Sequence, residues 1–382
     1  MRGRREGQQD LFIIFNLEDR VPMDHPLRKI KRWADGVLAE MSRDFNRAYS
    51  HTGRPGVPPE QLLKALLLQA LYAIPSESKL VEAIEYNVLY RWFVDLPMEQ
   101  KAWTQEAFSM NRQRFEAHDL FRKFFDRVVA EAIDQGLVSA DHFTVDGTLM
   151  RSLASHKSLR PIAETTAKES NEKNDGDGDS NTPSGRDDLV DWKGQKRSNQ
   201  THRSTTDPEA RLARKGLGRE SHLCHSGHVL MENRHGLCMN ITVDTADGRA
   251  EPRNALRMVR HVERRHHLVP ETLGADANYH PGWFLVALEE HGTTPHVPIK
   301  AKKIRGQSQE AQARRRAKIR MKTLGYRISQ RVRKRCEQII GWGKTVAGLA
   351  RTKFIGHVRI ENSALMCGAA YNLLRMSRLV PS

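Results

Sequence analysis

The spacing of apolar side chains changes at Ser139, and this change limits the possible fold more than any other feature of the sequence. Between Pro58 and Leu137, apolar residues recur at the three- and four-residue intervals of amphipathic helices. Pro59 suits the first turn of a helix, and Gly136 suits a helix end. From Ser139 onward, strand patterns alternate with helical ones. We therefore expect an all-helical domain followed by an α/β domain.

The elements predicted after Ser139 have the order strand, hairpin, helix, strand, helix, strand, helix. The first strand, His142–Val145, ends in Asp146-Gly147. The other elements are the strands His228–Asn233 and Leu237–Val243 with a turn at 234–236, the helix Ala250–Arg265, the strand Thr272–Ala275, the helix Pro281–His291, the strand Thr294–Ile299, and the helices Tyr326–Ala350 and Ala364–Leu379. Such an order fits a mixed sheet flanked by helices.

Composition divides the chain further. Residues 1–57 contain several proline and glycine turn residues, and we expect an irregular lead-in there. Residues 58–137 form the helical domain, and residues 138–160 together with 207–382 form the sheet domain. The intervening residues 161–206 are polar and contain few sizeable apolar side chains, so we expect a disordered insertion.

The charge of the chain points to a polyanionic partner. Its 382 residues include 62 Lys and Arg against 46 Asp and Glu, a formal net charge of +16. Residues 300–335 hold 15 Lys and Arg and a single acid, Glu310. A helix face that only meets solvent usually mixes charges, so this excess favours nucleic acid as the partner. The four cysteines and the lack of a long apolar run lead us to expect a cytoplasmic protein.

Three acids stand out by their positions. Asp146 and Asp276 each follow a predicted strand, and Glu337 lies on a predicted helix just after the basic stretch. Acids at the ends of strands can converge at one edge of a sheet, and carboxylates are the ligands that Mg²⁺ prefers. Each acid alone has an ordinary explanation, as a turn residue or as a partner of neighbouring basic residues. Arg333 and Lys344 lie four residues before and seven residues after Glu337, on roughly the same side of the helix.

Several short motifs occur in a defined order along the chain. They are Arg54–Ala65, Arg91-Trp92-Phe93, Val145–Leu149, Arg203–Leu212, His228–Arg234, Gly274-Ala275-Asp276 with Tyr279, and Arg333, Glu337 and Lys344 at their mutual spacing. In these motifs the chain resembles bacterial insertion-sequence transposases of the D-D-E type, and more narrowly the family named after insertion sequence five. The resemblance spans roughly residues 50–375. Gln330 stands where the family signature has tyrosine.

The resemblance implies a ribonuclease-H-like catalytic core. In it, Asp146, Asp276 and Glu337 would be the catalytic residues and would bind two Mg²⁺ or Mn²⁺ ions. The enzyme would cut double-stranded DNA at the terminal inverted repeats of its element and join the 3′ ends to target DNA. It would act as a homo-oligomer, most simply a dimer, in the bacterial cytoplasm at the nucleoid. The residues expected to bind DNA are Arg327, Arg331, Arg333, Lys334 and Lys344.

Other interpretations of the sequence remain open. The basic stretch alone would also suit a catalytically decayed, transposase-derived protein that only binds DNA. A nuclease that hydrolyses without joining ends is a third possibility. Cys224, His228, His235 and Cys238 are of the residue types that bind zinc, but their spacing is not that of a familiar zinc finger, and a plain β-hairpin explains it better.

Overall fold

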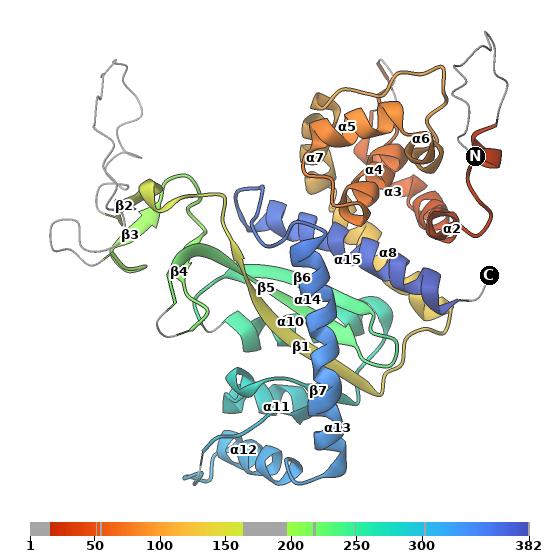
Figure 1. Cartoon of the computed structure of the whole chain (residues 1–382). Helices are drawn as coiled ribbons and strands as arrows, with labels where there is room; N and C mark the ends of the chain where they lie inside the picture. Colours follow the sequence, from red (N-terminus) through yellow and green to blue (C-terminus); the bar gives the residue numbers. More distant parts are fainter. Residues whose placement is uncertain are drawn as a thin grey trace, which may run out of the picture.

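The N-terminal part of the chain is a layer of helices at one end of the molecule (Figure 1). The computed structural model describes residues 16–380 except 51, 54–55, 163–196, 217–218, 249 and 302. The helices are α1 (Leu17–Arg20), α2 (Pro26–Glu40), α3 (Ser42–Ala48), α4 (Pro59–Leu71), α5 (Glu77–Tyr86), α6 (Val88–Val94), α7 (Glu106–Ala117) and α8 (Leu120–Asp134). Their buried leucine and phenylalanine side chains join the main core of the protein. The predicted helical domain is confirmed.

The expectation of an irregular lead-in over residues 1–57 is wrong for the part that the structure describes. The longest helix there is α2, whose buried side chains recur at helical spacing: Leu27, Ile30, Ala34, Val37 and Leu38. Pro26 occupies its first turn, where a proline costs no hydrogen bond. The His25 side chain accepts a hydrogen bond from the Leu27 backbone N–H at 3.2 Å and caps the helix. Pro26, a turn residue in the sequence-based prediction, therefore marks the start of a helix.

The second part is built on a six-stranded mixed sheet. Its strands are β1 (His142–Arg151), β4 (Arg211–Ala213), β5 (His222–Glu232), β6 (Cys238–Thr245), β7 (Thr272–Gly274) and β8 (Thr294–His296). Central β1 pairs antiparallel with β5 and parallel with β7, β5 pairs antiparallel with β6 and β4, and β7 pairs parallel with β8. The order β6-β5-β1-β7-β8, with only β5 reversed, is the ribonuclease-H-like arrangement. The β5–β6 hairpin was also predicted.

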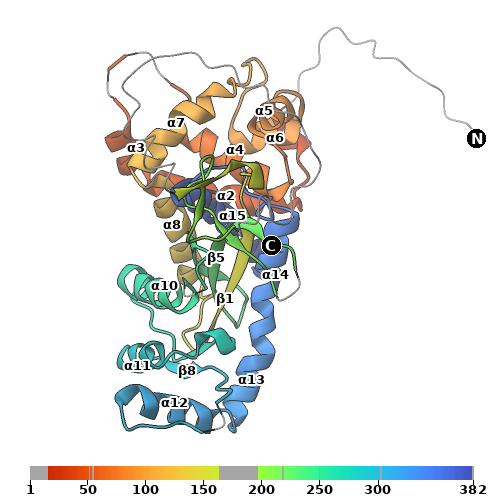
Figure 2. The same cartoon turned by 90° about the vertical axis from the view of Figure 1, so that its left-hand side faces the viewer.

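Helices cover both faces of this sheet. They are α10 (Ala250–His266), α11 (Gly282–Glu290), α12 (Gln309–Arg320), α13 (Leu324–Val332), α14 (Cys336–Thr345) and α15 (His357–Leu379). Figure 2 shows the sheet between α10 on one side and α13 with α14 on the other. The long α15 packs on β6 and also on α2, α4 and α8, so it joins the sheet to the helical layer. No described helix is long and apolar enough to cross a membrane.

The structure differs from the predicted element boundaries in several places, of which three bear on the site or on the predicted insertion. The first strand continues past Asp146-Gly147 to Arg151, because β5 pairs with it along its whole length. A 3₁₀ turn at Arg333–Arg335 interrupts the long helix predicted at Tyr326–Ala350. Of the predicted insertion 161–206, residues 163–196 lie outside the described part, while its last residues include β3 (His202–Ser204), which pairs with β2 (Leu159–Pro161).

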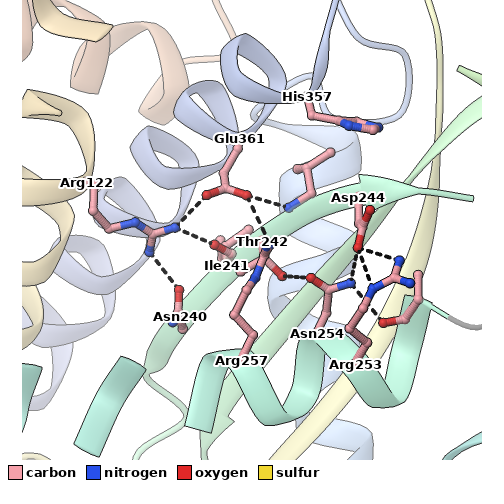
Figure 3. Close-up of polar contacts among 12 residues, drawn as sticks. Arg122, Asn240, Ile241, Thr242, Asp244, Arg253, Asn254, Arg257, His357 and Glu361 are labelled. Atoms are coloured by element: carbon pink, nitrogen blue, oxygen red, sulfur yellow. Dashed lines mark hydrogen bonds and ion pairs between the residues drawn. The ribbon is translucent and has the colours of Figure 1, made fainter. Parts of the chain in front are cut away.

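Side chains from the helical layers bind the outer edge of β6 (Figure 3). Glu361 of α15 accepts a hydrogen bond from the Val243 backbone N–H at 2.8 Å. Arg122 of α8 donates to the Ile241 carbonyl at 3.0 Å and to Glu361 at 2.9 Å. An edge strand with unpaired backbone groups is prone to pair with other chains. Here two charged side chains satisfy two of those groups and attach the helical domain to the sheet.

Candidate active site

The pairing of β1 with β7 brings the first two predicted acids to the same level of the sheet. The strands run parallel with Thr144 opposite Gly274. Asp146 and Asp276 each lie two residues further along the chain. Because β7 ends at Gly274 while β1 continues, Asp276 leaves the sheet next to Asp146. The register of two strands thus brings together acids that are 130 positions apart.

The third predicted acid approaches from α14. Glu337 lies in the first turn of that helix, which packs on β1 and β5, and its side chain is exposed. Burial raises the pKa of Asp146, Arg333 lowers it, and the charges of Asp276 and Glu337 raise it further. The net result is a raised pKa for Asp146. The three acids therefore share one electrostatic environment, with negative charge in excess.

Arg333 is the basic group closest to this environment. Its Nη1 lies 3.5 Å from Oδ2 of Asp146, and both side chains are largely buried. Its Nε is buried and has no hydrogen-bond partner among the described residues. The 3₁₀ turn at Arg333–Arg335 separates α13 from α14. The break in the helix therefore lies directly at the site.

The chemistry of the donors fits a hard divalent cation. Asp146, Asp276 and Glu337 offer only carboxylate oxygens, and burial, with a smaller contribution from the two neighbouring acids, leaves Asp146 with a raised pKa. Within the described part of the chain, no three His, Cys, Asp or Glu side chains lie close enough together to hold a metal ion. The structure thus places the predicted acids near one another without drawing them into a coordination shell.

The other residues expected to bind DNA fall into two groups. Arg327, Arg331 and Lys334 are exposed and follow one another at intervals of four and three residues, on one face of α13 and its continuation. Lys344, at the other end of α14, is half-buried. Burial lowers its pKa, and the nearby Lys215 contributes to the same effect. The first group offers charge to solvent, whereas Lys344 is half-buried beside a second lysine.

Gln330, the departure from the family signature, has a structural role. Its Nε2 donates to the Ala275 carbonyl at 3.2 Å and to the His296 carbonyl at 2.8 Å. These carbonyls follow β7 and end β8. Gln330 therefore fixes α13 against the strand end that carries Asp276.

A fourth acid at this edge escaped prediction. Glu251 lies in the first turn of α10, and its carboxylate is close to Gly147, the residue after Asp146. An acid in the first turn of a helix is common because it suits the helix dipole. For that reason nothing in the sequence distinguished Glu251 from an ordinary helix start.

Two family models match the chain. Residues 15–114 match a family model described as Transposase domain (DUF772), and residues 189–373 match one described as Transposase DDE domain. The chain belongs to the DDE transposases. The second match spans β3 through most of α15, including Asp276 and Glu337, and the first spans most of the helical layer.

Other comparisons add little. No curated protein sequence matches this transposase. A solved structure described as "Mos1 transposase paired-end complex with left transposon end" is 13% identical, and the match covers 88% of this chain and 90% of that one. Its TM-score is 0.21, which carries no argument about this transposase. The assignment to the family therefore comes from the two domain matches and the motifs.

Proposed function

We propose that this transposase cuts DNA at the ends of its element and joins the 3′ ends to target DNA, with Asp146, Asp276 and Glu337 as its catalytic and metal-binding residues. The observation that supports this most is the β1–β7 register, which sets Asp146 beside Asp276. Glu337 acts on the same aspartate from α14. Two Mg²⁺ or Mn²⁺ ions held there would supply an activated water or 3′-hydroxyl and stabilise the leaving oxygen.

The chain's own residues divide the remaining work. Asp146 lies in β1, which pairs with β5 over Phe143–Arg151, and gives the site a rigid reference point. Arg333 offsets part of its charge and offers a guanidinium to a phosphate that approaches the acids. Gln330 holds α13 to the strand end, so that Arg333 keeps its place.

The exposed cations extend the surface that meets DNA. Arg327, Arg331 and Lys334 leave the site along α13, and phosphate contacts of this kind position a duplex without reading its sequence. Lys344 would take a phosphate on the far side of Glu337. We assign recognition of the terminal inverted repeats to the helical domain and expect two copies to hold the two ends together. We place this cutting and joining of DNA in the bacterial cytoplasm, at the nucleoid.

An excision assay tests the proposal. A marker is placed between the terminal repeats that flank the gene, and the wild type is compared with Asp276→Asn and with Glu271→Gln. Glu271 is an exposed acid immediately before β7, at the end of the strand opposite to Asp276. The control therefore removes a charge next to the same strand but outside the site. We expect excision by the wild type and by Glu271→Gln, and none by Asp276→Asn. Purified wild-type protein should lose cleavage in EDTA and regain it with Mg²⁺.

The assay also separates the alternatives. Binding to the ends without cleavage by the wild type would identify a decayed, DNA-binding descendant. Cleavage without joined products would identify a nuclease that only hydrolyses. Full excision by Asp276→Asn would reject the proposed acids.

A further inference from the structure

Glu251 reaches the catalytic edge of the sheet because residue 147 has no side chain. A Cβ built on Gly147 would lie 3.0 Å from Oε1 of Glu251 and 3.3 Å from its Cγ. Any larger residue at 147 would push the carboxylate away, since such contacts are tighter than ordinary packing allows. The glycine next to Asp146 thus makes room for an acid from α10.

This acid comes from the opposite side of the sheet to Glu337. Figure 2 shows α10 and α14 on the two sides of the strands. Beyond Gly274 there is no β7 between them, so side chains from both faces can meet beside β1. Burial raises the pKa of Glu251, and the charges of Asp276 and Asp146 raise it further, against a hydrogen bond from the Asn278 side chain. Glu251 therefore lies within electrostatic range of both aspartates.

A buried hydroxyl without a hydrogen-bond partner lies near these acids. Tyr279 is fully buried, and its hydroxyl has no hydrogen-bond partner among the described residues. Burial raises its pKa well above the usual value, and the charges of Glu251, Asp146 and Asp276 act in the same direction. Buried hydroxyls are nearly always hydrogen-bonded. A hydrated cation between the carboxylates would offer Tyr279 a water, or would shift a carboxylate toward it.

We propose that Glu251 is a fourth carboxylate of the active site and binds a divalent cation such as Mg²⁺ or Mn²⁺ together with Asp146 and Asp276. The inference rests on the proposed function and adds a ligand that the three-acid motif does not contain. In the described part of the chain these carboxylates do not yet lie close enough together to hold an ion, so a bound cation would draw them toward one another. Its competitor is a purely structural role, in which Glu251 only stabilises the N-terminus of α10.

Calorimetric titration of the full-length, DNA-free protein with Mn²⁺ distinguishes the two roles. The variants are Glu251→Gln, Asp276→Asn and, as a control on the same helix, Glu263→Gln, which lies three turns away and pairs with His291. We expect Glu251→Gln to weaken Mn²⁺ binding at least about tenfold or to remove one bound ion, as changes around metal ligands do. Glu263→Gln should bind like the wild type. Circular dichroism confirms that each variant is folded.

A second variant keeps every carboxylate. Gly147→Ala should also weaken Mn²⁺ binding, because the added methyl group displaces Glu251. Should either variant fail to fold, wild-type protein loaded with Fe²⁺ and treated with ascorbate gives an independent readout. Backbone cleavage is then expected close to residues 147, 251 and 276.

The outcomes separate this inference from the proposed function. Wild-type Mn²⁺ affinity and stoichiometry in Glu251→Gln, with binding lost in Asp276→Asn, would overturn the role of Glu251 alone. Iron-dependent cleavage at 276 without cleavage at 251 would do the same. Unchanged binding in Asp276→Asn as well would overturn the proposed site itself.

Discussion

Two clusters of arginine and carboxylate differ in how completely their charges are balanced. On α11, Glu289 accepts hydrogen bonds from Arg320 at 2.6 Å and from Arg316 at 3.1 Å. Burial would raise the pKa of Glu289, but these two bonds outweigh it and the pKa is lowered. At the active site, Asp146 has one arginine 3.5 Å away and two acids nearby, and its pKa is raised.

The comparison shows that a basic stretch does not reveal by itself which of its charges meet DNA. Arg316 and Arg320 belong to the same run of basic residues as Arg333. On α12 the arginines serve the fold, since Arg315 also donates to the Gly306 carbonyl at 2.5 Å. At the active site one arginine faces three carboxylates, so a bound cation could neutralise the remaining negative charge. A cluster whose charges are balanced within the protein stabilises the fold, whereas a cluster with unbalanced negative charge is suited to bind a cation.

The largest expected effect comes from neutralising the acid in each cluster. Asp146→Asn should lower the rate of strand cleavage by a factor on the order of 10³ or more, because metal-assisted charge stabilisation supplies several kcal/mol. Glu289→Gln should leave the rate within about threefold, since it lies outside the site. Single-turnover cleavage of labelled terminal-repeat DNA measures both. Equal losses in the two variants would remove the distinction between the clusters.

Replacing one arginine in each cluster should separate function from stability. Arg333→Ala should slow cleavage by about 10- to 100-fold, as loss of a charge-positioning group does, and should also lower the thermal midpoint, because Asp146 loses the cation that offsets its charge. Arg320→Ala should leave the rate nearly unchanged and destabilise the fold by about 1 kcal/mol, because Glu289 keeps Arg316 and is partly exposed to water. Thermal denaturation and cleavage rates are measured on the same preparations. A slower cleavage rate in Arg320→Ala, with an unchanged rate in Arg333→Ala, would mean that Arg320 and not Arg333 serves the active site.

The opposite pKa shifts predict opposite responses to acid in metal-free protein. Since the pKa of Glu289 is lowered, its contribution to stability is present above the unfolded value of 4.5 and is lost as the pH falls through the folded pKa. Since the pKa of Asp146 is raised above 3.8, its charged form costs stability at neutral pH, and the cost disappears as acid protonates it.

Melting curves in EDTA check this pair of signs. Asp146→Asn should raise the thermal midpoint at pH 7 by a degree or two, on the order expected for relief of one unfavourable charge, and the gain should vanish near pH 4. Glu289→Gln should lower the midpoint at pH 7 and converge with the wild type in acid. A loss of stability in Asp146→Asn at pH 7 would show that Arg333 already balances this acid.

The difference between the clusters also shows what the sequence could predict. The strand–helix order, the hairpin, and the two aspartates in β1 and after β7 could be predicted, because strand patterns and acids next to turn residues are local signals. The partners of Arg316 and Arg320 were not, because Glu289 lies on another helix, 27 and 31 positions away. Glu251 gave no local signal either, since its meaning depends on Gly147 across the sheet.

The smallest expected effect concerns the salt dependence of DNA binding. Arg331 is exposed on α13, whereas Arg316 is held by Glu289. If Arg331 contacts a phosphate, Arg331→Ala should reduce the slope of log Kd against log salt by about 0.9, the share of one released counterion. Arg316→Ala should leave that slope unchanged, because its charge is already neutralised within the protein. Equilibrium binding to one duplex over a range of salt concentrations measures both slopes. A reduced slope in Arg316→Ala would place α12 on the DNA as well, and the completed cluster would then have to open when DNA binds.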